Sequence, residues 1–137
     1  MAPLAANLYV SDTVALARYL EDDLPKKANE VFEMAEAGKA TILVPDIVIA
    51  EFIYIGLKGR LKFSDPRAII GELLSDLQSS PYLLPVGVSS EAWNIYIDSM
   101  VPELHDRLIY SVALASKVAA IITNDPGIIA SGYPTIW

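Results

Sequence analysis

Apolar residues along the chain alternate between short runs typical of buried strands and longer stretches with helical spacing. Four strands are predicted, at Leu8–Ser11, Thr41–Val44, Tyr82–Val86 and Ala119–Thr123, and a last extended piece at Thr135–Trp137. Helices are predicted between them, at 13–20, 26–37, 46–57, 66–77, 89–98 and 102–117, with a short helical turn from Pro126. Because strands alternate with helices, we expect a three-layer α/β/α fold with a central, mostly parallel sheet.

Residues with known positional preferences mark the ends of several predicted elements. Asp46 is expected to cap the helix that runs to Leu57, and Gly38 to stop the helix before it. Pro66 follows Asp65 at the first position of another helix, where proline is favoured. No repeat, low-complexity segment or linker divides the chain, so residues 1–137 are expected to form a single domain.

Composition narrows the class of protein. The 137 residues are enough to bury a core without disulfides, and the absence of cysteine excludes thiolate metal sites. An apolar content of 53% suits a parallel sheet that is buried on both faces. Met1–Val10 has no lysine or arginine, which speaks against a signal peptide, and Pro45, Asp46 and Glu51 interrupt the apolar stretch Ala40–Leu57. We expect a soluble, cytoplasmic protein with no membrane segment.

Four carboxylates fall where such a sheet would bring them to one edge. Asp12 and Asp125 directly follow predicted strands, while Glu51 and Asp106 lie on helices that follow or precede strands. In open parallel sheets the ligand site lies beyond the carboxyl ends of the strands, where the strand order reverses. If the first and fourth strands are neighbours, Asp12 and Asp125 face each other there. Gathered carboxylates repel one another unless a cation lies between them, and oxygen ligands suit a divalent metal ion.

Each acid also has a structural explanation. Asp12 and Asp125 fit helix caps, and Asp106 fits a first-turn acid that complements the helix dipole. Glu51 is hardest to explain in this way, because the apolar segment Ile47–Ile55 offers it no charged partner. Four such positions at one edge favour a metal site over four unrelated caps.

Four segments, in order, resemble the acidic motifs of the PIN domain family: residues 7–13, 44–51, 104–115 and 121–125. The resemblance covers nearly the whole chain and implies a sheet ordered 3-2-1-4-5. It also implies a metal-dependent endoribonuclease related to the VapC-type toxins of prokaryotic toxin–antitoxin pairs. Two positions depart from the family pattern: Pro126-Gly127-Ile128 replace a charged and an aromatic residue, and Ser11 replaces an apolar one. Neither departure removes an expected metal ligand.

The chemistry implied by the resemblance is hydrolysis of RNA phosphodiester bonds with Mg²⁺ or Mn²⁺. Asp12, Asp106 and Asp125 would hold the metal directly or through water. Glu51 would bind a metal or the attacking water. Thr123 and Asn124 would orient these carboxylates from behind.

One alternative to catalysis remains open: a PIN-like module that has kept its acids and works by binding or scaffolding. His105 stands beside Asp106 and suggests acid–base catalysis. Because adjacent helical residues point in different directions, we expect His105 to be an exposed or packed residue and not a catalytic one.

The expected partners are an RNA substrate and a small antitoxin protein. The net charge of −7 argues against binding nucleic acid through bulk electrostatics. Three of the ten basic residues, Lys58, Arg60 and Lys62, crowd into one short run, and Arg107 adjoins Asp106. These four residues are candidates for contacts with RNA phosphates, with a partner chain, or with solvent alone.

Apolar richness points to a homodimer or a larger assembly. Tyr54, Trp93, Tyr96 and Trp137 are expected to be exposed aromatics that could contribute to such an interface. Trp93, Ile97 and Met100 share helical spacing, which is also typical of a buried core face.

Overall fold

Five parallel strands form a sheet in the order β3-β2-β1-β4-β5 in the computed structural model, which describes residues 7–137. The strands are β1 (Leu8–Ser11), β2 (Thr41–Pro45), β3 (Leu83–Val86), β4 (Ala120–Ile122) and β5 (Thr135–Ile136). This order confirms the predicted topology. Residues 1–6, part of the segment considered for a signal peptide, lie outside the described residues.

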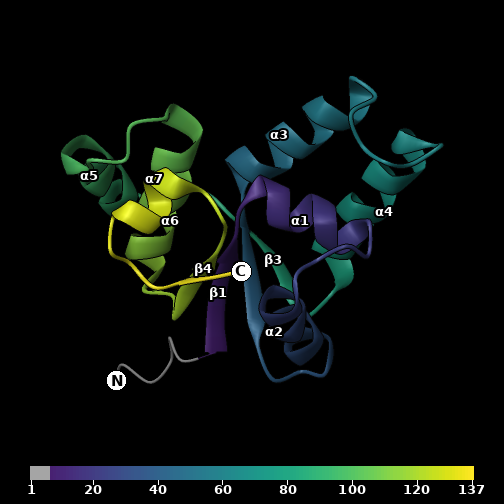
Figure 1. The fold of residues 1–137 in the computed structure, drawn as a ribbon, viewed down its shortest axis with the longest axis horizontal. Helices are drawn as coiled ribbons and strands as arrows, with labels where there is room; N and C mark the ends of the chain where they lie inside the picture. Colours follow the sequence, from purple (N-terminus) through teal and green to yellow (C-terminus); the bar gives the residue numbers. More distant parts are fainter. Residues whose placement is uncertain (1–6) are drawn as a thin grey trace.

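Helices cover the sheet from both sides (Figure 1). On one side lie α1 (Thr13–Leu20), α2 (Lys26–Glu36), α3 (Asp46–Leu57) and α4 (Pro66–Ser79), and on the other α5 (Ser90–Asp98), α6 (Leu104–Ser116) and α7 (Pro126–Ala130). The helices change sides because the chain moves outward from β1 to β3 and then returns to β4, while each crossover stays right-handed. The strand order therefore reverses between β1 and β4, and their carboxyl ends are neighbours.

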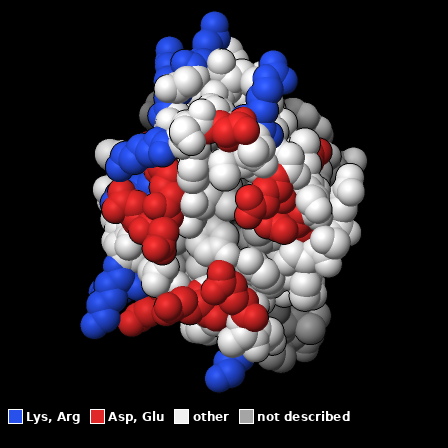
Figure 2. Space-filling view, turned by 90° about the vertical axis from the view of Figure 1, so that its right-hand side faces the viewer, with Lys and Arg blue, Asp and Glu red and all other residues white. Residues whose placement is uncertain are grey.

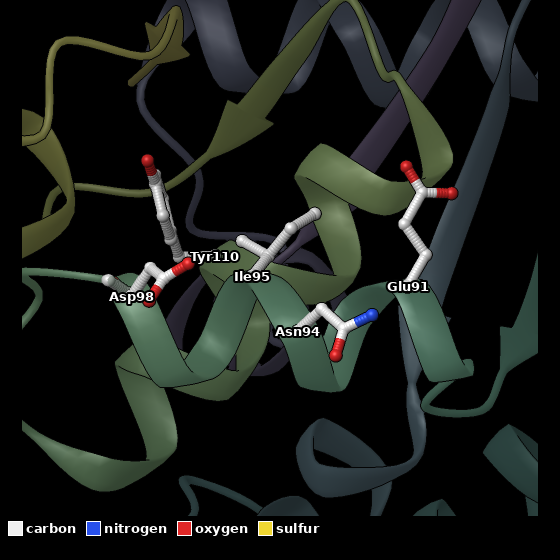
Figure 3. Close-up of a pocket in the computed structure, with 6 residues that line it drawn as sticks. Glu91, Asn94, Ile95, Asp98 and Tyr110 are labelled. Carbon is white, nitrogen blue, oxygen red and sulfur yellow. The ribbon is translucent and has the colours of Figure 1, made fainter.

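The face beside α3 and α4 carries acidic side chains in separate patches, with lysine and arginine mainly around its margin (Figure 2). On the opposite side, Glu91, Asn94, Ile95, Asp98 and Tyr110 line a hollow of about 340 Å³ between α5 and α6 (Figure 3). None of the carboxylates predicted to bind metal lines this hollow. The face drawn in Figure 2 shows no broad basic area.

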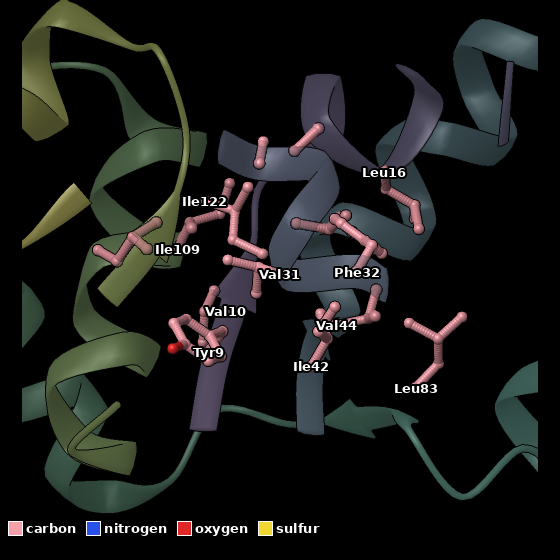
Figure 4. Close-up of a cluster of buried hydrophobic side chains, with 14 of the residues drawn as sticks. Tyr9, Val10, Leu16, Val31, Phe32, Ile42, Val44, Leu83, Ile109 and Ile122 are labelled. Atoms are coloured by element: carbon pink, nitrogen blue, oxygen red, sulfur yellow. The ribbon is translucent and has the colours of Figure 1, made fainter. Parts of the chain in front are cut away.

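The core lies on both faces of the sheet (Figure 4). Phe32 of α2 and Leu16 of α1 pack on one side, and Ile109 of α6 lies on the other, all essentially inaccessible to solvent. Each fully buried side chain of this size contributes about 1.5–3 kcal/mol. Burial on both faces explains why β4 reads as a continuous apolar run in place of an alternating one.

Several element ends differ from the predicted ones by one or two residues, and at two helix starts the structure shows which residue acts as the cap. Pro45, and not Asp46, occupies the cap position of α3; Asp46 is the first helical residue, where its charge complements the dipole. Helix α6 begins at Leu104, two residues after Pro102, because the Glu103 side chain accepts a hydrogen bond from the Asp106 N–H and so caps the helix. The predicted end of α2 is confirmed, since Gly38 adopts a φ of 79° just beyond it.

Helix α3 is apolar around most of its circumference. Val48 and Phe52 face the core, while Tyr54 and Leu57 remain 56% and 54% exposed. Among residues 7–137, no helix combines the length and apolar character needed to cross a membrane. The outer side of α3 is thus an apolar surface next to the carboxyl edge of the sheet.

Candidate active site

Asp12 follows β1 and is buried, with only 5% of its surface exposed. Its Oδ1 accepts the Ala15 N–H at 2.8 Å, which caps α1, and its Oδ2 accepts the Thr123 hydroxyl. Burial raises the pKa of Asp12 to about 6, and the hydrogen bonds from Thr123 and Ala15 oppose this rise only in part. The negative charges of Asp125 and Glu51 raise the pKa of Asp12 further. Asp12 is therefore both a helix cap and a carboxylate short of compensating positive charge.

Asp125 occupies the matching position after β4. Its Oδ2 accepts the Ile128 N–H at 2.9 Å, which caps α7, and its own N–H donates to Thr123 Oγ1 at 3.0 Å. Thr123 is fully buried and so ties Asp12 to Asp125. A Cβ at Gly127 would stand 3.1 Å from Asp125 Oδ2 and 3.4 Å from Pro102 Cδ. Glycine at this position therefore avoids a close contact with the Asp125 carboxylate.

Asp106 lies in the first turn of α6, as predicted. Burial raises its pKa to about 7, and the charge of Asp125 together with a hydrogen bond to it is the next cause. Glu103 and Asp12 add smaller repulsions. Asp125 and Asp12 are thus close enough to oppose the ionisation of Asp106, although the three residues come from separate parts of the chain.

Glu51 has partners that the sequence did not suggest. Its Oε1 accepts the Thr13 hydroxyl at 2.6 Å, and its Oε2 lies 2.9 Å from His105 Nδ1. Within its own segment, Ile47–Ile55, Glu51 has no charged partner, as expected. Its two partners, Thr13 and His105, come from α1 and α6. The charge of Glu51 also contributes to the raised pKa of Asp12, which places it within the same cluster.

Sequence reasoning missed the part that Thr13 and His105 play. His105, which was expected to be exposed or packed, is 44% exposed; it also contacts Glu51 and lies 3.6 Å from Glu103. The only available signal was adjacency, since each of the two residues neighbours a predicted metal ligand. Asn124, the other residue expected to orient the carboxylates, is exposed just beyond β4.

The carboxylates fit a hard divalent cation by their chemistry. All are oxygen donors, and no lysine or arginine among residues 7–137 forms an ion pair with any of the four. Within the same range, no three His, Asp or Glu side chains come close enough to enclose an ion. Mg²⁺ commonly uses one or two carboxylates and keeps several waters, so this looser arrangement suits it better than a closed cage would.

The four basic candidates divide into two groups. Arg107 donates to the carbonyls of Tyr96 and Ile97 at 2.8 and 3.1 Å, which holds α5 against α6. Lys62 pairs with Asp23 at 3.3 Å. Lys58 lies over the Tyr54 ring, and Arg60 lines a groove beside the carboxylates. Arg107 and Lys62 therefore have structural partners, while Arg60 lines the groove that also contains Glu51.

The groove that contains Arg60 has a volume of about 550 Å³ and runs along α3. Glu51 and His105 form one part of its wall, and Ile47, Tyr54 and Ile55 supply most of its apolar lining. Because Glu51 belongs to the groove and to the carboxylate cluster, the two are continuous.

Solved structures with the same fold come from three bacteria. VapBC2 from Rickettsia felis, bound to a DNA fragment from its promoter, gives a TM-score of 0.68 at 19% identity, covering 93% of this chain and 96% of that one. Mycobacterium tuberculosis VapC20, described as a sarcin-ricin loop cleaving toxin, gives 0.61 at 15% identity, with 91% and 95% covered. FitAcB from Neisseria gonorrhoeae gives 0.59 at 16% identity, with 93% and 95% covered.

Sequence comparison identifies the family. No protein of curated function matches the chain significantly. A family model does match: that of the PIN domain, over residues 9–130, which includes all four carboxylates and, apart from residues 7 and 8, the four predicted acidic motifs. The chain therefore belongs to the PIN domain family.

Proposed function

We propose that this protein is a metal-dependent endoribonuclease that hydrolyses RNA phosphodiester bonds and acts as the toxin of a toxin–antitoxin pair. The observation that carries the proposal is the meeting of Asp12, Glu51, Asp106 and Asp125 at the carboxyl edge of the sheet, with raised pKa values at Asp12 and Asp106. Uncompensated carboxylates destabilise a fold, so their presence together indicates a function.

In this proposal Asp12, Asp106 and Asp125 hold Mg²⁺ or Mn²⁺, directly or through water, and Glu51 binds a metal or the attacking water. When bound, the ion would act as a Lewis acid toward the phosphate and would lower the pKa of the attacking water. Thr123 fixes the separation of Asp12 and Asp125 through its two hydrogen bonds. The capping bonds to Ala15 and Ile128 hold each aspartate to a rigid helix.

Cleavage of total cellular RNA tests the proposal. The wild-type protein is expected to cut RNA with Mg²⁺ present and to stop when a chelator is added. Asp125→Asn, which keeps an oxygen to cap α7, is expected to lose most of this activity. If Mg²⁺ raises the melting temperature of the wild type but no RNA is cut, the protein is a binding or scaffolding module in place of an enzyme.

Gly127→Ala is expected to lower the rate of RNA cleavage about tenfold, because the new methyl group would press on Asp125 Oδ2 from 3.1 Å. The same change should not weaken α7 through helix propensity, since alanine is the better helix former. The control is Gly71→Ala in α4, where a Cβ meets nothing within 4 Å. That control should cleave RNA normally, and equal rates for the two variants would contradict the steric argument.

Arg60→Ser is expected to weaken RNA binding about three- to tenfold. It should also reduce by about one the slope of the logarithm of RNA affinity against the logarithm of salt concentration. Arg60 lines the groove next to Glu51, whereas Lys62 is already paired with Asp23. Lys62→Ser is therefore the matched control and should change binding less than twofold. Binding is measured by fluorescence anisotropy in chelator, so that no RNA is cleaved. Equal losses for both variants would show that only the overall charge of the loop matters.

A small DNA-binding antitoxin is the proposed protein partner. The structures of similar fold include VapBC2 and FitAB, both described as bound to DNA fragments. With a net charge of −7, this chain is poorly suited to bind DNA by itself, so DNA contacts would fall to the partner. A short gene for a DNA-binding protein next to this gene would support the pairing.

Self-association is proposed through the outer face of α5 and the loop that follows it. Trp93, Ile97, Met100 and Leu104 are 49%, 71%, 93% and 56% exposed, so their helical spacing does not mark a core face. Tyr96 and Trp137, expected to be exposed, are partly covered by the guanidinium groups of Arg107 and Arg18. Light scattering at micromolar concentration measures whether the protein is a dimer.

A further inference from the structure

The Glu51 carboxylate is held by two hydrogen-bond donors from different elements. The Thr13 hydroxyl of α1 donates to Oε1 at 2.6 Å, and His105 Nδ1 of α6 lies 2.9 Å from Oε2. A carboxylate only accepts, so the proton in the second contact belongs to His105 Nδ1. With one donor on each oxygen, rotation of the carboxylate about its last bond would break both contacts.

His105 also lies beside Glu103. Its Nδ1 lies 3.6 Å from Glu103 Oε2, and Glu103 uses its other oxygen to cap α6 through the Asp106 N–H at 2.9 Å. A connected series of contacts therefore leads from the backbone of Asp106, through Glu103 and His105, to Glu51. The two ends of this series are both members of the carboxylate cluster.

Stability alone does not account for these contacts. The His105 and Glu51 side chains are 44% and 28% exposed, and pairs that are open to solvent contribute little to folding. Val48 and Phe52 already anchor α3 in the core, so its position does not depend on Glu51. What the contacts do determine is the direction of a charged group beside Asp12, whose pKa Glu51 helps to raise.

We propose that His105 and Thr13 are positioning residues that fix the Glu51 carboxylate in the orientation required for metal and water binding. Neither residue is assigned contact with the metal. Residues that hydrogen-bond to a metal-binding carboxylate commonly change metal affinity by about 10- to 100-fold when replaced. The expected effect of these residues on catalysis rests on the proposed function. Their expected effect on metal binding does not, because metal binding can be measured without RNA.

Paired substitutions test the inference through binding of Mn²⁺ in the absence of RNA, followed by electron paramagnetic resonance. His105→Phe and Thr13→Val keep the approximate size of each side chain but remove the donor. We expect each to weaken Mn²⁺ binding about 10- to 100-fold. His105→Asn places an amide N–H near the position of Nδ1, and Thr13→Ser keeps the hydroxyl, so both should stay within about threefold of the wild type.

Ser116→Ala is the control for general disturbance of α6, because Ser116 ends the helix at the opposite terminus from His105 and its side chain makes none of the hydrogen bonds described. It should bind Mn²⁺ like the wild type. A second measurement, the Mg²⁺ concentration for half-maximal RNA cleavage, should rise for His105→Phe and return toward normal for His105→Asn. RNA affinity in chelator should be unchanged by Thr13→Val, because Thr13 does not line the groove.

The outcomes separate this inference from the proposed function. Equal Mn²⁺ affinity for wild type and His105→Phe would overturn the positioning role, even if RNA is cleaved. Equal losses for His105→Phe and His105→Asn would overturn it as well, because the donor would then be irrelevant. If the affinities follow the expected order but the wild type cleaves no RNA, the positioning role stands and the ribonuclease proposal fails.

Discussion

Asp12→Asn is expected to lower RNA cleavage about 100- to 1000-fold while making the metal-free protein more stable. Cleavage falls because the variant removes the most buried of the four proposed metal-binding charges. Stability rises because the same charge is held in a poorly solvated position, where burial raises its pKa from 3.8 to about 6. A shift of this size corresponds to about 3 kcal/mol of destabilisation at neutral pH.

The expected gain in stability depends on pH in a definite direction. Folded Asp12 binds its proton more tightly than the unfolded chain does, so raising the pH from about 4 through about 6 destabilises the wild type. Asparagine does not titrate. The variant should therefore be more stable by about 1–3 kcal/mol at pH 8, and this difference should vanish near pH 4. The asparagine oxygen can still accept the Ala15 N–H, so the cap of α1 is kept.

Urea unfolding at pH 8 and pH 4.5, in chelator, measures this difference. Asp65→Asn is the matched control, because Asp65 caps α4 through Ala68 at an exposed position far from the other acids in sequence. The control should leave RNA cleavage unchanged and should show no pH-dependent gain. A destabilised Asp12→Asn protein at pH 8 would contradict the view that the cluster strains the fold.

Metal affinity is expected to fall about 1000-fold between pH 8 and pH 5. The pKa of Asp106 is raised to about 7 and that of Asp12 to about 6, so both carboxylates take up protons within this range. A metal ion must displace these protons, which costs about tenfold in affinity at pH 5 for Asp12 and about 100-fold for Asp106. Ordinary carboxylates with pKa values near 4 would lose little affinity over the same interval.

Calorimetric titration with Mn²⁺ at pH 5, 6, 7 and 8 measures the effect. Asp106→Asn should bind more weakly at pH 8 and should show a smaller decrease toward pH 5, since one of the two titrating groups is gone. Asp65→Asn should follow the wild type at every pH. An affinity that is constant from pH 5 to pH 8 would rule out competition between protons and metal at these carboxylates.

The strands and helices were accessible from sequence because buried strands and capped helices each leave a local pattern, whereas the order of the strands came from the resemblance to the PIN domain family. The run Ala119–Thr123 is apolar throughout, and Pro66 follows Asp65 as helix starts require. The position of the α3 cap was not accessible, because Pro45 and Asp46 both suit a helix start and only the fold decides between them. Likewise, the start of α6 depended on the long side chain of Glu103, an uncommon cap.

The acids themselves were found by their positions after strands and within apolar segments, but their partners were not. Glu51 meets Thr13 across 38 residues of sequence, and His105 reaches it from a third element. Arg107 looked like a substrate contact because it adjoins Asp106, yet its guanidinium group joins α5 to α6. Long-range side-chain contacts leave no periodic signal, so adjacency to a candidate ligand was the only available guide.

Asp12 and Asp125 each use one oxygen to cap a helix, whereas Asp106 does not cap α6 and Glu51 lies within α3. This asymmetry has an evolutionary consequence. In a lineage that no longer needed catalysis, selection for folding would still preserve the two capping aspartates, or replace them by asparagine or serine. Glu51 and Asp106 would drift first. Among descendants of such a protein, these two positions are therefore the better indicators of retained activity.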